Sequence, residues 1–176
     1  INGLLRKDRI LDVLYNFIFF PDEDSKKIKI VCNYSQYFAS RKLLENVLKH
    51  RKISGVTDTA RDGKGGTFFG TTGCGKSFCM LFLGRLLMTC KELNSPTIIY
   101  ITDRTDLDDQ LSETMVNATR FINDKDVKKI TSRNNGKDSL TETLKGHKSG
   151  GVYLTTIQKF TEDAGLLSNR DNIIYS

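Results

Sequence analysis

Hydrophobic residues recur at helical spacing early in the chain and gather into strand-like runs later. The apolar positions of residues 4–19 are spaced as on one helix face, and Pro21 with the acidic residues after it ends a predicted first helix. Residues 28–32 predict a short strand. A second amphipathic helix is predicted from about residue 34 to Lys49. Its apolar face holds Tyr37, Leu44, Val47 and Leu48.

The middle of the chain alternates loops with long apolar runs. Residues 51–65 are rich in Gly, Thr, Asp and Lys and predict a surface loop. Residues 66–69 are β-prone, and the apolar run over residues 78–88 has the length of a helix. Residues 96–101 predict a strand buried on both faces, as in parallel sheets, followed by a helix through about Met115.

The last third of the chain contains a polar stretch between two strand signals. Residues 123–149 carry many lysines among Asn, Ser and Gly, which favours a solvated insertion with one short helix over a DNA contact. Residues 152–155 predict a third core strand, and residues 173–175 begin a fourth. This alternation predicts an α/β fold with a mostly parallel sheet.

Composition narrows the class of protein. The chain has 176 residues, of which 38% are hydrophobic and 27% charged, so disorder of the whole chain is excluded. It has no apolar run of about eighteen residues and no signal-peptide pattern, which predicts a cytoplasmic protein without membrane contact. A formal charge of +6 permits a polyanionic partner without requiring one.

The cysteines suggest neither a metal site nor a disulfide framework. Cys32, Cys74, Cys79 and Cys90 form no CxxC pair, and the two histidines stand far apart in the sequence. We expect four reduced thiols.

The most informative motif spans residues 70–77, which match the phosphate-binding pattern GxxxxGK[ST]. A β-prone run precedes it and a helical run follows it, the order that such a loop requires, so a chance glycine turn is the weaker alternative. The predicted nucleotide-binding residues are Gly70, Thr71, Thr72, Gly73, Cys74, Gly75, Lys76 and Ser77.

Each residue type in this loop has a chemical reason. Glycines at positions 70, 73 and 75 allow positive φ and close approach to a phosphate. The amides of residues 73–77 can point at the β-phosphate, Lys76 can reach the β- and γ-oxygens as the catalytic cation, and the Ser77 hydroxyl can join a Mg²⁺ shell. The sequence therefore predicts ATP and Mg²⁺ as cofactors. A working NTPase also needs a carboxylate on a neighbouring strand, and no such strand is present in full.

Three further segments extend the motif into a family resemblance. Residues 33–48 (NYSQYFASRKLLENVL), 97–111 (TIIYITDRTDLDDQL) and 150–160 (GGVYLTTIQKF), together with the phosphate loop, closely resemble the motor subunit of type I restriction enzymes, in helicase superfamily 2. The resemblance runs from about Leu4 to Ser176. It implies a RecA-like P-loop domain, the first of two motor lobes, with residues 1–50 as a helical linker and adenine-recognition segment and residues 51–176 as the lobe.

The resemblance also implies an activity and partners. In the family, ATP hydrolysis drives translocation of double-stranded DNA before endonucleolytic cleavage, in a complex with modification and specificity subunits. The chain looks cut just before a DEAH-type Walker B motif, so we expect the fragment alone to be inactive. The nuclease domain and the second lobe lie outside it.

Roles in base recognition follow from the resemblance residue by residue. Gln36, with Tyr34 and Tyr37 beside it, matches the glutamine-centred segment that reads adenine. The amide can pair with the base edge while a tyrosine packs on the ring. Which tyrosine stacks is left open, and a solvent-facing helix residue is the alternative for Gln36.

The DNA track is assigned in the same way. Thr102 and Arg104 occupy motif Ia, and Thr155, Thr156, Gln158 and Lys159 match the next motif. The alternatives are a surface ion pair of Arg104 with Asp106 or Asp108 and a helix cap by Thr156.

The phosphate loop differs from the family pattern at two positions, and two alternative functions stay open. Gly70 stands where the family often has histidine or another residue, and Cys74 stands where it has serine, which makes the loop a target for thiol reagents. One rival is another superfamily 2 helicase or DNA-remodelling ATPase without a nuclease. The other is a P-loop kinase, in which Arg104 would hold the acceptor.

Overall fold

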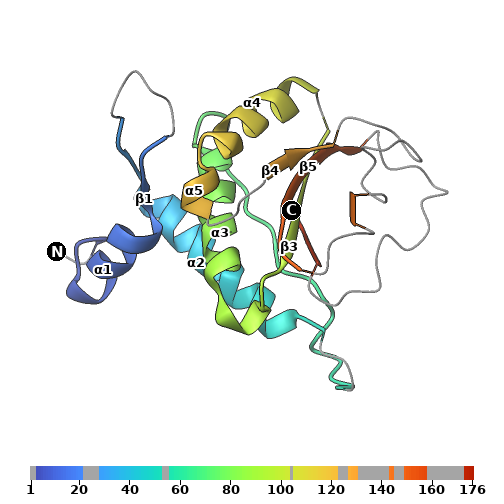
Figure 1. Ribbon diagram of the computed structural model, residues 1–176. Helices are drawn as coiled ribbons and strands as arrows, with labels where there is room; N and C mark the ends of the chain where they lie inside the picture. Colours follow the sequence, from blue (N-terminus) through green and yellow to red (C-terminus); the bar gives the residue numbers. More distant parts are fainter. Residues whose placement is uncertain are drawn as a thin grey trace.

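A four-stranded parallel sheet forms one layer of the molecule, and the helices α2 to α5 lie together on one side of it (Figure 1). In this computed structural model, the described residues are 3–21, 28–52, 56–103, 105–122, 127–130, 143–144, 149–157 and 173–176, with the backbone alone for residues 105–110. Among them, no helix has the length and apolar character needed to cross a bilayer.

The sheet has the order β4-β5-β3-β6. Its strands are β3 (Thr97–Thr102), β4 (Val127–Lys129), β5 (Val152–Thr156) and β6 (Ile173–Tyr175), and every pairing is parallel. The prediction of an α/β fold with a parallel sheet is confirmed. β4 was not expected, because its Val-Lys-Lys sequence lies in the polar stretch and carries almost no apolar signal.

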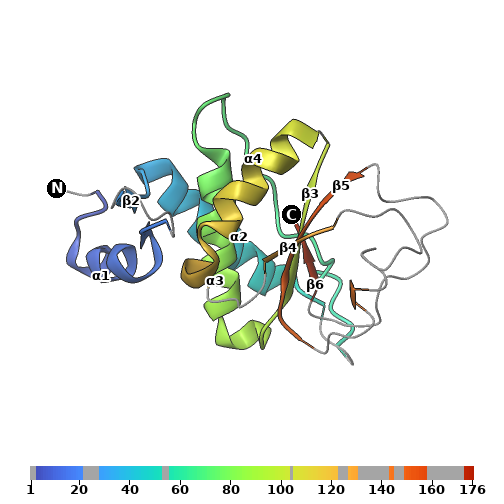
Figure 2. The ribbon, with the colours of Figure 1, turned by 45° about the horizontal axis from the view of Figure 1, so that its top comes forward.

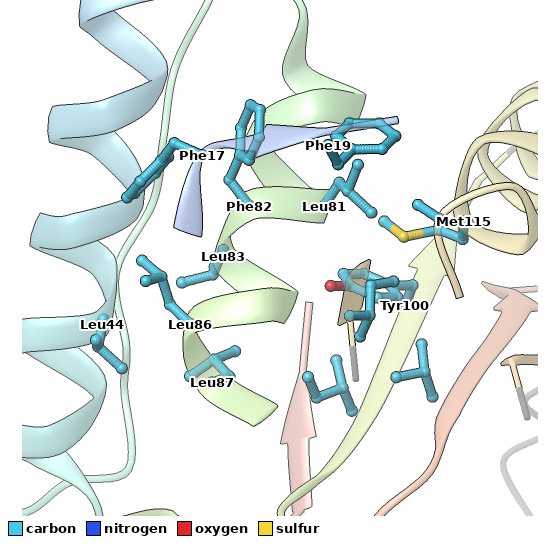
Figure 3. Close-up of a cluster of buried hydrophobic side chains, with 14 of the residues drawn as sticks. Phe17, Phe19, Leu44, Leu81, Phe82, Leu83, Leu86, Leu87, Tyr100 and Met115 are labelled. Carbon is cyan, nitrogen blue, oxygen red and sulfur yellow. The ribbon is translucent and has the colours of Figure 1, made fainter. Parts of the chain in front are cut away.

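The helices agree with the sequence pattern. They are α2 (Tyr34–His50), α3 (Lys76–Thr89), the short 3₁₀ helix η1 (Lys91–Leu93), α4 (Thr105–Val116) and α5 (Thr119–Ile122). α3 is the most buried of these, because apolar residues surround it on nearly all sides. Its leucines and Phe82 form the main core with Tyr100 of β3 and Met115 of α4 (Figure 3).

α2 and α3 run side by side in the same direction. The Gln36 side chain donates to the carbonyl of Gly75, and the Ser40 hydroxyl donates to the carbonyl of Cys79. Both pairs are separated by 39 positions. Because the difference in residue number is the same for both pairs, the two helices run in the same direction. Their N-termini therefore lie at the same end (Figure 1).

The N-terminal part packs on α2 and α3, on the side of these helices away from the sheet (Figure 2). It consists of α1 (Lys7–Asn16) and an antiparallel pair, β1 (Ile18–Phe19) and β2 (Ile30–Val31). The first helix was expected to reach Phe19 but ends at Asn16. Phe17 and Phe19 are buried against α2 and α3 residues, and β1 gains backbone partners from β2, so tertiary contacts override the helical pattern.

The predicted strand over residues 66–69 is wrong. These residues have no regular structure and pair with none of the described strands. Gly66 has φ of +126°, outside the strand region, and an added Cβ at Gly65 would lie 2.9 Å from the Val47 side chain. β-propensity alone cannot make a strand when no neighbour takes its backbone hydrogen bonds.

Gly84 allows β3 to approach α3 closely. Tyr100 is fully buried and donates its hydroxyl to the Met80 carbonyl at 2.9 Å. A Cβ at Gly84 would lie 2.5 Å from that hydroxyl oxygen but 3.7 Å from the ring carbon that bears it. The hydroxyl oxygen of Tyr100 is therefore the one atom of that side chain that excludes a Cβ at position 84.

We predict that Gly84→Ala destabilises the wild-type chain by about 1 to 3 kcal/mol, the usual cost of overpacking. In a Tyr100→Phe background the same change should be neutral or stabilising, because the clash is gone and alanine favours a helix by about 1 kcal/mol over glycine. Urea unfolding of the four proteins measures both effects. An equal loss in the two backgrounds would contradict this account of the glycine.

Asp12 is the polar centre of the contact between α1 and α2. Its carboxylate accepts from Arg41 Nε at 2.8 Å, from the Arg41 terminal nitrogen and from the Asn16 side-chain amide at 2.8 Å. Burial alone would raise the pKa of Asp12, but these hydrogen bonds outweigh it and hold the pKa below its ordinary 3.8.

The sign of this shift predicts a loss of stability in acid. A lowered folded-state pKa contributes stability that is complete above pH 3.8 and is lost as the pH falls through the folded-state value. At pH 7, Asp12→Asn should therefore lower the free energy of unfolding by about 1 to 2 kcal/mol.

The difference between the two proteins should shrink when urea unfolding is repeated at pH 3. Asp8→Asn is the matched control, because Asp8 lies on the same helix and pairs with the preceding Arg6 through side chains that are 56% and 49% exposed. Such an exposed pair contributes little. A difference that stays constant between the two pH values would refute the assignment.

Candidate nucleotide-binding site

The loop over residues 70–77 lies at the carboxyl edge of the sheet. α3 packs on β3 through the bond between Tyr100 and Met80 and runs in the opposite direction, so its first turn is at the edge where the parallel strands end (Figure 1). Ligands of open α/β sheets bind at this edge. The fold thus places the predicted phosphate loop where it can meet a ligand.

Three glycines of the loop are required for two different reasons. Gly73 and Gly75 have φ of +80° and +81°, the left-handed region that was predicted for them. Gly70 has no positive φ, but an added Cβ there would lie 2.5 Å from Cys74 Sγ. Gly70 therefore makes room for the cysteine, so the predicted conformational reason is wrong at this position.

The two parallel helices differ at their N-termini. α2 is capped, because the Asn33 side chain accepts from the backbone amide of Gln36. α3 begins at Lys76, and its N-cap residue Gly75 provides no side-chain cap. The first amides of a helix lack intrahelical acceptors and carry a partial positive charge. The uncapped amides at the start of α3 are therefore suited to bind an anion.

The Lys76 side chain is held by the loop itself. Its ammonium group donates to the carbonyls of Gly70 at 3.0 Å and Thr71 at 2.9 Å. An ammonium group has three donors, so one remains for a ligand. This arrangement places the positive charge over the loop, beside the amides of α3.

Gln36 links the start of α2 to the phosphate loop. Its Oε1 accepts from the backbone amide of Asn33 at 2.9 Å, and its Nε2 donates to the carbonyl of Gly75 at 3.1 Å. The side chain is buried, so the alternative of a solvent-facing helix residue is wrong. The spacing of Asn33 and Gln36 is that of a capping box, a signal in the sequence that could have predicted this geometry.

The two tyrosines near Gln36 have different environments. Tyr34 is 60% exposed and packs against Phe38, with ring centroids 4.6 Å apart. Tyr37 is 7% exposed, and its ring packs against Phe17 in the core at 4.9 Å. Tyr37 is therefore a core residue rather than a free stacking surface. It lies two turns before Leu44 on the same side of α2, and Leu44 is also buried, which explains this burial.

Ser40 also contacts the start of α3, although no pattern in the sequence predicts this contact. It is fully buried, and its hydroxyl donates to the carbonyl of Cys79 at 3.3 Å in the first turns of α3. With Gln36, which precedes it by four positions, it fixes α2 against the phosphate loop. A serine in an amphipathic pattern has no signal of this kind, because its partner is distant in the sequence.

The residues predicted to contact DNA are only partly described. Thr102 and Thr156 are register partners at the carboxyl ends of β3 and β5, so the sheet brings these motifs together. Thr155 and Thr156 are 1% and 3% exposed, and this burial does not support a contact through their hydroxyls. Arg104, Gln158 and Lys159 lie outside the described residues, so their DNA contacts stay predictions.

Comparison with known proteins identifies relatives. The model of the SWI2/SNF2 ATPase family matches residues 35–175. The endonuclease subunit of type I restriction enzyme HindI from Haemophilus influenzae is 35% identical over 181 residues, which cover 99% of this chain and 16% of that subunit. A Methanocaldococcus jannaschii protein named as the MjaIXP endonuclease subunit is 30% identical, over 98% of this chain and 15% of its own length.

These relatives confirm the resemblance to type I restriction enzymes. The chain spans less than a fifth of the length of either relative. No solved structure matches it significantly.

Burial predicts that Cys74 reacts before the two buried thiols. The four cysteines are free, and Cys74 is half-buried in the phosphate loop. Cys79 and Cys32 are buried, and burial raises the pKa of both thiols, that of Cys32 to about 11. We therefore expect N-ethylmaleimide to modify Cys74 well before Cys32 or Cys79, as measured by peptide mass spectrometry.

ATP should slow the modification of Cys74 specifically. Cys90, which is also half-buried but lies at the far end of α3, provides the internal control because ATP should not change its rate. Equal protection of both thiols would argue against a phosphate site at residues 70–77.

Proposed function

The chain belongs to the SWI2/SNF2 ATPase family, and from that premise we propose that it is the first motor lobe of a type I restriction enzyme's endonuclease subunit. In this proposal it binds ATP and couples hydrolysis to movement along double-stranded DNA. The observation that carries the proposal is the uncapped start of α3 with the Lys76 ammonium held over the loop beside it.

The phosphate chemistry follows from these groups. The amides of residues 75–77 are acceptor-free donors at a helix N-terminus and suit the β-phosphate. The remaining donor of Lys76 suits an oxygen between the β- and γ-phosphates, where charge grows as the γ-phosphoryl group leaves. Lys76 is in this proposal the catalytic cation.

A magnesium ion fits the loop through one hydroxyl. Ser77 is the second residue of α3, next to Lys76, and Mg²⁺ keeps several waters and is commonly held by few protein oxygens together with substrate phosphates. In the part of the chain that the structure describes, no group of three or more His, Cys, Asp or Glu could hold a metal ion. Bound Mg²⁺ would neutralise charge on the phosphates.

The orientation of the Gln36 amide supports adenine as the base. Asn33 fixes its oxygen and Gly75 fixes its nitrogen, so one N–H donor and one oxygen lone pair remain. Adenine presents an acceptor at N7 and a donor at N6, which a glutamine amide can pair with at both positions, whereas guanine presents two acceptors. Tyr34, with its exposed ring, is the better candidate of the two tyrosines to pack on the base.

The remaining parts of the proposal concern the whole subunit. DNA contacts are proposed for Thr102, Arg104, Gln158 and Lys159, with partners that include the modification and specificity subunits, in the cytoplasm. Residues 1–50 would form the linker and adenine-recognition segment and residues 51–176 the motor lobe. We also propose that the isolated chain hydrolyses ATP at close to background, because hydrolysis also requires Walker B carboxylates and arginines of a second lobe.

The family match weighs against a P-loop kinase. A superfamily 2 remodelling ATPase without a nuclease shares the same loop chemistry. The names of the relatives favour the restriction subunit over that alternative.

The test is ATP hydrolysis by the full-length subunit, measured with and without duplex DNA. We predict that DNA stimulates the wild-type rate and that Lys76→Ala lowers the stimulated rate by at least about a hundredfold, the loss typical of a missing charge-stabilising group. Folding should be unaffected, because the Lys76 side chain is exposed. Lys64→Ala, at an 85% exposed lysine outside the loop, is the control and should leave the rate unchanged.

A wild-type rate that is the same with and without DNA would overturn the motor assignment. A Lys76→Ala protein that hydrolyses ATP normally would overturn the phosphate site itself.

A further inference from the structure

α2 is held on two adjacent sides. Gln36 and Ser40 bind the first turns of α3. Of the residues that follow each of them, Tyr37 packs its ring against Phe17 at the end of α1, and Arg41 binds Asp12 of α1. A helix turns by about 100° per residue, so these two pairs form neighbouring stripes on α2. The contact with α1 and the contact with the phosphate loop therefore meet on the same two turns.

The pair between Asp12 and Arg41 has the geometry of a strong ion pair. Arg41 donates from both Nε and a terminal nitrogen, so the contact is bidentate and defines direction as well as distance. The Asp12 side chain is only 15% exposed, and Arg41 also lies over the Phe17 ring at 5.9 Å. This contact can hold α2 in one position along its axis.

The position of α2 decides where Gln36 lies relative to the phosphate loop. The bond from Gln36 to Asn33 lies within the N-terminal turn of α2 and moves with the helix, whereas the bond to Gly75 crosses to the loop. Of the two bonds of Gln36, a shift of α2 would therefore change only the one to Gly75. It would move the amide away from its place beside the phosphates, while the loop over residues 70–77 kept its own geometry.

We propose that Asp12 and Arg41 are a positioning pair for base selection, which keeps the Gln36 amide in register with the phosphate loop. The inference rests on the proposed function, in which Gln36 pairs with adenine. Neither Asp12 nor Arg41 touches the nucleotide in this proposal. They act through α2, and the phosphates are bound independently of them.

A role in fold stability alone would have a different consequence. Loss of a purely structural contact weakens every ligand of the site by the same factor. Loss of a positioning contact weakens the ligand whose base is read and spares a ligand that has phosphates only. A comparison of the affinities for ATP, GTP and inorganic tripolyphosphate therefore distinguishes a positioning role from a purely structural one.

The experiment measures equilibrium binding of these three ligands to the full-length subunit with Mg²⁺. The variants are Asp12→Asn and Arg41→Gln, with Arg41→Lys as a milder change that keeps the charge but not the bidentate contact. We expect the preference for ATP over GTP to fall by about tenfold in the first two variants, the factor that one hydrogen bond is worth. It should fall less in Arg41→Lys, with tripolyphosphate binding unchanged in all three.

Asp8→Asn is the matched control, since the same substitution on the same helix removes an exposed pair. The proposal is overturned if the variants keep wild-type selectivity, if all three ligands weaken together, or if Asp8→Asn has the same effect. If Asp12→Asn or Arg41→Gln fails to fold, Arg41→Lys decides between these outcomes. Wild-type protein that binds ATP and GTP equally overturns the adenine assignment and this proposal together, while tripolyphosphate binding still reports on the phosphate loop.

Discussion

The parallel docking of α2 on α3 is the contact on which the site depends. Two buried side chains, Gln36 and Ser40, hold carbonyls in the first turns of α3, at Gly75 and Cys79. Buried polar groups of this kind are costly unless they are paired, so each bond specifies one register between the helices. Apolar packing alone would tolerate a slide of α2 along α3, because leucine contacts are not directional. The hydrogen bonds of Gln36 and Ser40 oppose such a slide and so contribute to the position of α2 beside the phosphate loop.

The sheet contributes to the site by fixing the other side of α3. Tyr100 of β3 is buried against the helix at Gly84 and donates to Met80. Since β3 also pairs with β5 and β6, the strand ends and the first turn of α3 are held at a common edge. α3 is thereby held between Tyr100 on one side and Ser40 on the other, and its amide end is left free of both.

What the sequence could predict follows from how far apart the interacting residues are. The phosphate loop, β3, β5 and β6 were predictable because a motif or a short apolar run carries all of the signal. The segment over residues 66–69 has the same β-prone character, but its conformation depends on a partner strand and on the approach of Gly65 to Val47. The end of α1 was missed for a similar reason, since Phe17 and Phe19 are placed by distant rings. Tyr37 was grouped with Tyr34 by adjacency to Gln36, although only the core decides which ring is buried.

The parallel arrangement also has an electrostatic consequence. Two helix N-termini side by side bring like partial charges together, which is unfavourable where water does not screen them. At α2 the Asn33 side chain satisfies an amide and reduces the effect, whereas α3 has no such cap. The Lys76 ammonium adds a further positive charge beside the same end. An anion at the start of α3 therefore offsets repulsion that the fold has built in.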